Sequence, residues 1–109
     1  MSSNKTDTEA RVRILDAPAQ LDMQSRDEFC DRAIELLEEM SPGGSCLVID
    51  LATTHYVDTS AVGTLAHLQG KAAERRNVIR LRNANEEIKF ALLLARMDEL
   101  FEMETPEGK

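Results

Sequence analysis

One acid and two hydroxyls stand together at Asp58, Thr59 and Ser60. They follow an apolar run, 46–51, that is predicted to be a buried strand, and they open an amphipathic segment, 60–75, that is predicted to be a helix. A helix N-terminus gathers unpaired backbone N–H groups and the positive end of the helix dipole. These side chains therefore indicate one of three roles: capping the helix, binding an anion, or carrying a phosphate on a hydroxyl.

Capping is the common role of such residues, because Asp, Ser and Thr lead the N-cap preferences. The surrounding sequence adds a second observation: C-L-V-I-D-L at 46–51 is followed by Y-V-D-T-S-A-V-G-T-L at 56–65. This arrangement resembles the STAS family, the domain of bacterial anti-sigma factor antagonists. In that family the hydroxyl residue directly after the acid is the regulatory phosphoacceptor. The resemblance therefore implies that Thr59 is the phosphoacceptor here.

The resemblance covers about residues 11–103. A-Q-L-D at 19–22 is similar to the family's G-E-L-D element, and M-D-E-L-F at 97–101 is similar to its G-L-x-x-L-F element. Three departures stand out: Ala61 replaces a glycine, R-N at 76–77 replaces Gly-Gly, and the polar stretch before Val12 leaves the family's first strand weak or missing. The resemblance implies a partner-binding face at Asp22, Asp58, Thr59, Ser60 and Ala61.

Length and charge limit the function classes. A chain of 109 residues predicts one domain, which we place at 10–103 between flexible tails at 1–9 and 104–109. The net charge of −7 argues against binding to a nucleic-acid backbone, which needs clustered cations. Cys30 and Cys46 are predicted to be free buried thiols in a reducing cytoplasm. We expect no membrane insertion, because no run of 18 apolar residues occurs.

The apolar pattern predicts an α/β fold with helices mainly on one face of the sheet, and the resemblance implies a single STAS-like domain with a small mixed β-sheet. Apolar and arginine residues alternate at 11–14 and 79–82, as in half-buried strands with arginines on the open face. The first helix is predicted to bury Phe29, Ala33, Leu36, Leu37 and Met40. The second is predicted to bury Val62, Leu65, Ala66, Gln69 and Ala73, and the third Ile88, Ala91, Leu92 and Ala95.

The third predicted helix has more apolar residues than one buried face requires. Phe90, Leu93 and Leu94 lie off its inner stripe. Packing against Leu100 and Phe101 is the preferred interpretation. An exposed apolar patch for a partner or for a second copy of the chain is the alternative.

Enzymatic and metal-binding functions have little support in the sequence. His55 and His67 are not spaced as zinc ligands, and no glycine-rich phosphate loop or G-x-S-x-G element occurs. We therefore expect no enzyme activity, cofactor or metal. Five basic residues between Lys71 and Arg82 are predicted to form a solvated face rather than a nucleic-acid site.

The resemblance implies a cytoplasmic protein of transcription regulation that works by partner switching. The unphosphorylated form would bind an anti-sigma factor that is also a serine/threonine protein kinase, and phosphorylation of Thr59 would end that binding. A phosphatase is a further candidate partner, and a homo-oligomer stays open. Alternatives are a STAS subunit of a lipid-trafficking ABC transporter, a scaffold component of a stress-sensing complex, and a small enzyme or nucleotide-binding protein.

Overall fold

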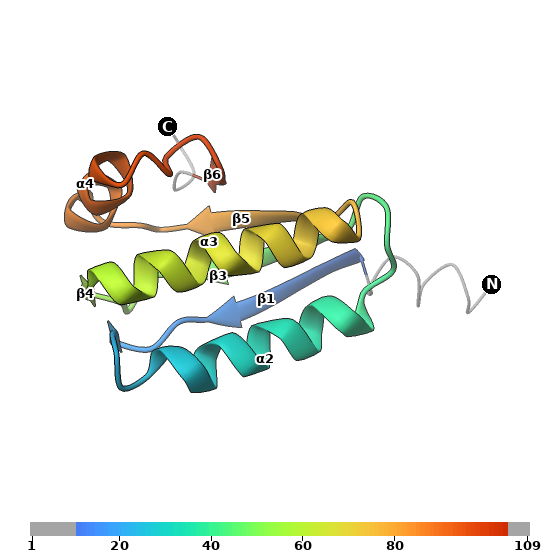
Figure 1. Cartoon of the computed structure of the whole chain (residues 1–109), viewed down its shortest axis with the longest axis horizontal. Helices are drawn as coiled ribbons and strands as arrows, with labels where there is room; N and C mark the ends of the chain where they lie inside the picture. Colours follow the sequence, from blue (N-terminus) through green and yellow to red (C-terminus); the bar gives the residue numbers. More distant parts are fainter. Residues whose placement is uncertain (1–10, 105–109) are drawn as a thin grey trace.

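The computed structural model describes residues 11–104, which form six strands and three helices. Figure 1 shows one helix in front of the central strand and another alongside the first strand, with the N- and C-terminal strands of the described region at opposite edges of the main sheet. In chain order the elements are β1 (Val12–Asp16), β2 (Gln20–Leu21), α2 (Arg26–Glu39), β3 (Cys46–Asp50), β4 (Tyr56–Val57), α3 (Thr59–Glu74), β5 (Val78–Arg82), α4 (Glu86–Leu94) and β6 (Glu102–Glu104).

The main sheet has the order β1-β3-β5-β6, and β3 is central, as its continuous apolar run predicts. The α/β class is confirmed. The expectation of a mixed sheet needs correction, because every strand pair within residues 11–104 is parallel. A helix or a long connection separates consecutive strands of the main sheet, and such crossovers produce parallel pairing. Patterning did not reveal β2, β4 and β6, which are only two or three residues long.

Helix α2 buries the stripe that the sequence predicts: Phe29, Ala33, Leu36, Leu37 and Met40. Its N-cap is Ser25, and Asp27 and Glu28 lie in the first turn. The chain leaves the helix through Gly43 and Gly44, whose φ angles of 88° and 101° favour glycine.

Helix α3 buries Ala61, Val62, Leu65, Leu68 and Ala72. The predicted stripe was therefore partly wrong: Gln69 is half-buried and Ala73 is exposed. Small residues surround the stripe on both sides, so the apolar pattern alone does not fix which of them face the sheet. After the helix, Arg76 has a φ of 59°, in the left-handed region. The Asn77 N–H donates to the Ala72 carbonyl at 2.9 Å, which closes the helix end without a glycine.

The two faces of the main sheet differ. Leu47, Ile49, Ile79 and Leu81 pack under the helices in the core. On the other face Val12 and Ile14 are 54% and 53% exposed, while Arg80 and Arg82 pair with Glu102 and Glu104. The expected arginines are therefore on the open face in β5. In β1 they are not, because Arg13 turns toward α2 and pairs with Glu39 at 3.2 Å.

Strands β2 and β4 form a separate, two-residue parallel ladder. The Asp58 N–H donates to the Leu21 carbonyl at 3.1 Å, and the His55 N–H donates to the Ala19 carbonyl at 2.9 Å. This ladder holds the segment before α2 against the segment before α3. At the other end, Glu104 belongs to β6, so the C-terminal tail predicted from residue 104 starts too early. The remaining predicted tail residues lie outside the described region.

Candidate functional site

Asp58 is the N-cap of α3. Its Oδ1 accepts the Ala61 N–H at 2.9 Å and the Ser60 hydroxyl at 2.7 Å. Its Oδ2 accepts the Met23 N–H at 3.1 Å from the turn before α2. One carboxylate therefore closes the helix end and joins it to a segment 35 residues earlier in the chain.

Hydrogen bonding lowers the pKa of Asp58 below its ordinary value of 3.8. The Ser60 hydroxyl contributes most, followed by the Ala61 N–H, because both donate to the charged form of the carboxylate. Asp58 is therefore ionised at neutral pH and places a negative charge beside the two hydroxyls.

The two hydroxyl residues after Asp58 differ in their surroundings. Ser60 is half-buried, and its hydroxyl is engaged by Asp58. Thr59 is exposed, and its hydroxyl makes no hydrogen bond within residues 11–104. Of the two, Thr59 is the more accessible to an incoming group.

Asp22 lies in the turn before α2, next to Met23, whose N–H binds Asp58. The structure thus brings Asp22, Asp58, Thr59 and Ser60 to one end of the domain. The Asp22 Oδ1 also accepts the N–H groups of Gln24 at 3.0 Å and Ser25 at 3.2 Å. Asp22 therefore shapes its own turn in addition to presenting a charge.

Ala61 does not belong to an accessible face, which corrects its prediction as a partner-binding residue. It is 0% exposed and is part of the hydrophobic core. The family's glycine position is therefore a packing position in this chain. Its methyl group anchors the first turn of α3 against the domain.

The surplus apolar residues of α4 are exposed, so the preferred packing interpretation is wrong for them. Phe90, Leu93 and Leu94 are 59%, 54% and 68% exposed. Phe101 is buried, while Leu100 is 46% exposed. The sequence pattern shows that these apolar residues are present, but it does not show that residues 95–104 leave their side chains exposed.

A groove of about 320 Å³ connects this surface to the α3 N-terminus. Thr59, Val62 and Gly63 line it from α3, and Leu94 and Met97 line it from α4 and the segment that follows. Thr59 therefore lies at the rim of an apolar groove. The sequence did not predict this neighbourhood, because α3 and α4 are separated by β5.

Other candidate residues do not assemble into a site. His55 and His67 are both exposed, and residues 11–104 contain no cluster of three metal-ligating side chains. The basic residues between 71 and 82 divide between the end of α3 and the open sheet face, where two of them are ion-paired. No helix within the described region is long and apolar enough to cross a bilayer.

Comparison with solved structures gives the same fold. A Planctomyces limnophilus protein described as an anti-sigma-factor antagonist (STAS) domain protein aligns with a TM-score of 0.78 and 17% identity, over 90% of this chain and 86% of its own. A Thermotoga maritima protein described as an anti-sigma factor antagonist aligns with a TM-score of 0.73 and 16% identity, over 90% of this chain and 81% of its own.

A Wolinella succinogenes protein described as a sulfate transporter family protein also aligns, with a TM-score of 0.66 and 15% identity, over 81% of this chain and 69% of its own. A search of curated proteins finds no significant match. The family model described as "Mlab, STAS domain" matches residues 5–103. With that match over most of its length, and with the cap, ladder and sheet described above, this chain belongs to the STAS domain family.

Proposed function

We propose that this chain is a cytoplasmic anti-sigma factor antagonist whose partner is an anti-sigma factor with serine/threonine kinase activity. Phosphorylation of Thr59 ends the binding. The observation that carries the proposal is the exposed Thr59 hydroxyl, unbonded within the described residues, beside the engaged hydroxyl of Ser60. The kinase therefore has one accessible acceptor at a position that matches the family's phosphoacceptor.

The partner surface combines a charged rim and an apolar groove. We call Asp22, Asp58, Thr59 and Ser60 the rim; of these, Thr59 also lines the groove, which runs from it to Leu94. The exposed side chains of α4 extend the apolar surface beyond the groove. Burial of such side chains supplies the free energy of binding, while the rim provides specificity.

Phosphorylation acts on this surface through charge. A phosphate adds about −1.5 to −2 charges at pH 7 and holds a tightly bound hydration shell. At Thr59 it stands beside the ionised Asp58 and at the rim of the groove. A partner that covers the rim must strip water from this charge, and this cost opposes binding. In the free domain the dipole of α3 and its first N–H groups stabilise the phosphate.

Affinity purification from native cells tests the proposal, with mass spectrometry of the captured proteins and of the Thr59 peptide. We expect wild type and Thr59→Ala to retain a soluble serine/threonine kinase, and Thr59→Glu to retain less of it. Ser60→Ala is the matched control, because it alters the neighbouring hydroxyl and leaves the acceptor. Equal capture of the kinase by Thr59→Glu and Thr59→Ala, with no phosphate found at Thr59, contradicts the switch.

A second candidate is a STAS subunit of a lipid-trafficking ABC transporter. Two observations favour it: Asp58 and Thr59 are followed by the small residues Ser60 and Ala61, and the matching family model carries the description "Mlab, STAS domain" rather than that of an anti-sigma factor antagonist. The same purification separates the two candidates. Capture of an ATPase together with transmembrane proteins supports the transporter.

A further inference from the structure

Within residues 11–104, strand β1 has a partner strand on only one of its edges. It pairs with β3 on that side, and no other described strand lies on its other side. The Ala17 N–H donates to the Asp50 carbonyl at 2.9 Å. Alternate residues of a parallel strand direct their backbone groups to opposite sides, so the N–H groups of Val12, Ile14 and Asp16 face outward. Such an edge is a template for another strand.

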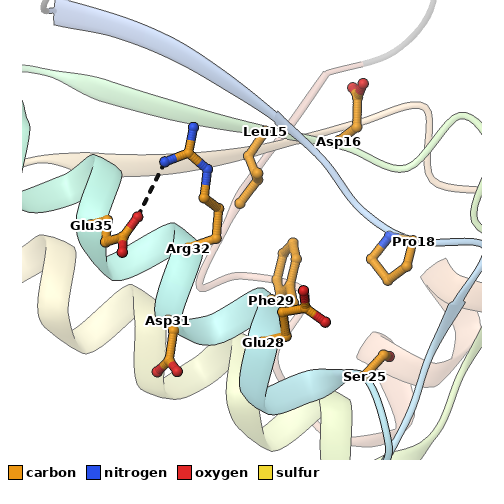
Figure 2. Close-up of a pocket in the computed structure, with 9 residues that line it drawn as sticks. All are labelled: Leu15, Asp16, Pro18, Ser25, Glu28, Phe29, Asp31, Arg32 and Glu35. Atoms are coloured by element: carbon orange, nitrogen blue, oxygen red, sulfur yellow. Dashed lines mark hydrogen bonds and ion pairs between the residues drawn. The ribbon is translucent and has the colours of Figure 1, made fainter.

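A groove of about 620 Å³ lies between this edge and α2. Figure 2 shows Leu15 and Phe29 pointing into it, with Glu28, Arg32 and Glu35 projecting from α2. Arg32 is paired with Glu35 at 3.2 Å, whereas Glu28 forms no ion pair within the described residues. The helix side of the open edge is therefore an apolar floor with an excess of negative charge.

The opposite side of the same edge is apolar for most of its length. Val12 and Ile14 expose more than half of their side-chain surface on the open face of the sheet. Asp16 follows them; it also lines the groove, but its carboxylate points away from α2 (Figure 2). A strand added beside β1 would therefore meet carboxylates on its helix side and aliphatic side chains on its open side.

We propose that the outer edge of β1 binds an extended segment of a partner protein in which basic and apolar residues alternate. The basic side chains lie under α2, with their stems on Leu15 and Phe29 and their charges near Glu28 and Glu35. The apolar side chains pack beside Val12 and Ile14 on the open face. Backbone hydrogen bonds to β1 supply the affinity, and the alternation supplies the specificity. This surface is separate from the Thr59 rim and does not depend on the proposed function.

An extended segment fits this place better than the other occupants. In Figure 1, α2 runs along the outer side of β1, so a second copy docked edge to edge would bring its own α2 to the same position. Residues 1–10 of this chain have the sequence M-S-S-N-K-T-D-T-E-A, with one basic and two acidic side chains. That sequence lacks the alternating basic and apolar pattern.

A synthetic peptide of alternating lysine and valine, labelled for fluorescence anisotropy, tests the proposal on the full chain. We expect it to bind, and a peptide of alternating glutamate and valine to bind at least about tenfold more weakly because its charges repel Glu28 and Glu35. Hydrogen exchange monitored by NMR should show that the outward amides of Ile14 and Asp16 become protected on binding. The amide of Leu15, which faces β3, should change little.

Two sets of variants separate strand addition from general attraction to an acidic protein. Ile14→Pro removes an outward N–H and no bond to β3, and should weaken binding by about tenfold. Glu28→Lys with Glu35→Lys changes two exposed side chains that line the groove, and should weaken binding similarly and keep the fold intact. Asp27→Lys with Glu38→Lys is the matched control, because it changes the net charge by the same amount at two exposed side chains that do not line the groove.

Several outcomes would overturn the proposal. One is equal binding of the peptide to wild type and to the Glu28→Lys, Glu35→Lys variant. Another is binding without protection of the Ile14 and Asp16 amides. A third is protection of the Ile14 and Asp16 amides in the free protein. If that protection is independent of protein concentration, residues 1–10 of the same chain occupy the edge. Protection that grows with concentration, together with a dimer in sedimentation, would assign it to a second copy.

Discussion

Helices α3 and α4 begin with the same cap geometry and different first turns. Asp58 and Asn85 both have extended backbones, and each accepts the N–H of the residue three positions later, Ala61 or Ile88. The next two residues are Thr59 and Ser60 in α3, and Glu86 and Glu87 in α4. Helix α4 thus carries carboxyl groups where α3 carries hydroxyls. Capping alone does not distinguish the two ends, whereas the side chains of the next two residues do.

The largest effect is expected at Thr59 itself. Thr59→Ala should abolish phosphate incorporation by the cognate kinase, because the remaining hydroxyl of Ser60 is engaged by Asp58. Phosphopeptide mass spectrometry after incubation with kinase and ATP measures this. Ser60→Ala should keep its phosphate on Thr59. Phosphate on Ser60 alone would place the acceptor one residue later and would contradict the assignment of Thr59.

The residues that anchor the two first turns should differ in their contribution to stability. Ile88→Ala removes a larger buried side chain and should lower the free energy of unfolding by about 3 kcal/mol. Ala61→Gly should lower it by about 2 kcal/mol, from lost helix propensity and a lost buried methyl group. Chemical denaturation of both variants measures the difference. An effect of Ala61→Gly below about 0.5 kcal/mol would show that its methyl group is not an anchor.

The two caps should contribute unequally. Asp58→Ala is expected to lower the free energy of unfolding by about 2 kcal/mol, because the Met23 N–H and the Ser60 hydroxyl lose their acceptor and the Ala61 N–H keeps only the backbone carbonyl of residue 58. Asn85→Ala should cost about 1 kcal/mol, since its Oδ1 accepts one N–H in the helix. Denaturation curves at pH 7 compare them. Equal losses would mean that the bonds from Met23 and Ser60 add nothing.

Acidification should affect the α3 end and leave the α4 cap unchanged. The pKa of Asp58 is lowered in the folded protein, so its ionised form stabilises the fold above the ordinary value of 3.8. This stabilisation is lost as the pH falls from about 4 through the lowered pKa. The difference in unfolding free energy between wild type and Asp58→Asn should shrink over that range. Asn85 does not titrate, so Asn85→Ala should show a constant difference.

The smallest expected effect comes from making α3 resemble α4. Thr59→Glu should raise the free energy of unfolding by about 0.3–1 kcal/mol, because a carboxylate at a helix N-terminus is favourable. Thermal unfolding at low ionic strength measures this gain. Thr59→Gln is the control, with a similar shape and no charge. A loss of stability with Glu that Gln does not share would mean that the neighbouring Asp58 charge outweighs the dipole.

The elements of the fold differ in how far the sequence could predict which of their side chains are buried. The stripe of α2 was predicted correctly because Phe29, Leu36 and Leu37 are large residues at helical spacing. For α3 the stripe was ambiguous, since alanines and a glutamine lie on both sides of it. The alternation in β1 was visible, but it did not reveal that Val12 and Ile14 face the uncovered side. A local sequence pattern shows the spacing of apolar residues. Which face of a helix or strand is buried depends on packing between elements that are distant in the sequence.

The candidate site was predicted from one local segment and completed by distant ones. Asp58, Thr59 and Ser60 are adjacent in the sequence, and the family resemblance placed Asp22 near them. The bond from Met23 to Asp58 and the groove toward Leu94 depend on β2–β4 pairing and on the position of α4. Two-residue strands carry too little pattern to be recognised in advance.

The β2–β4 ladder has a consequence for the order in which the domain folds. It joins Gln20 to Tyr56 through two residue pairs, whereas β1 and β3 share five. Pairing Gln20 with Tyr56 closes a long loop, and two residue pairs compensate poorly for the entropy lost on closing it. We therefore expect the ladder to form after the main sheet. Substitutions at Leu21 or Val57 should then chiefly accelerate unfolding and leave the folding rate nearly unchanged. The surface around Thr59 would be the last part of the molecule to assemble and the first to be lost.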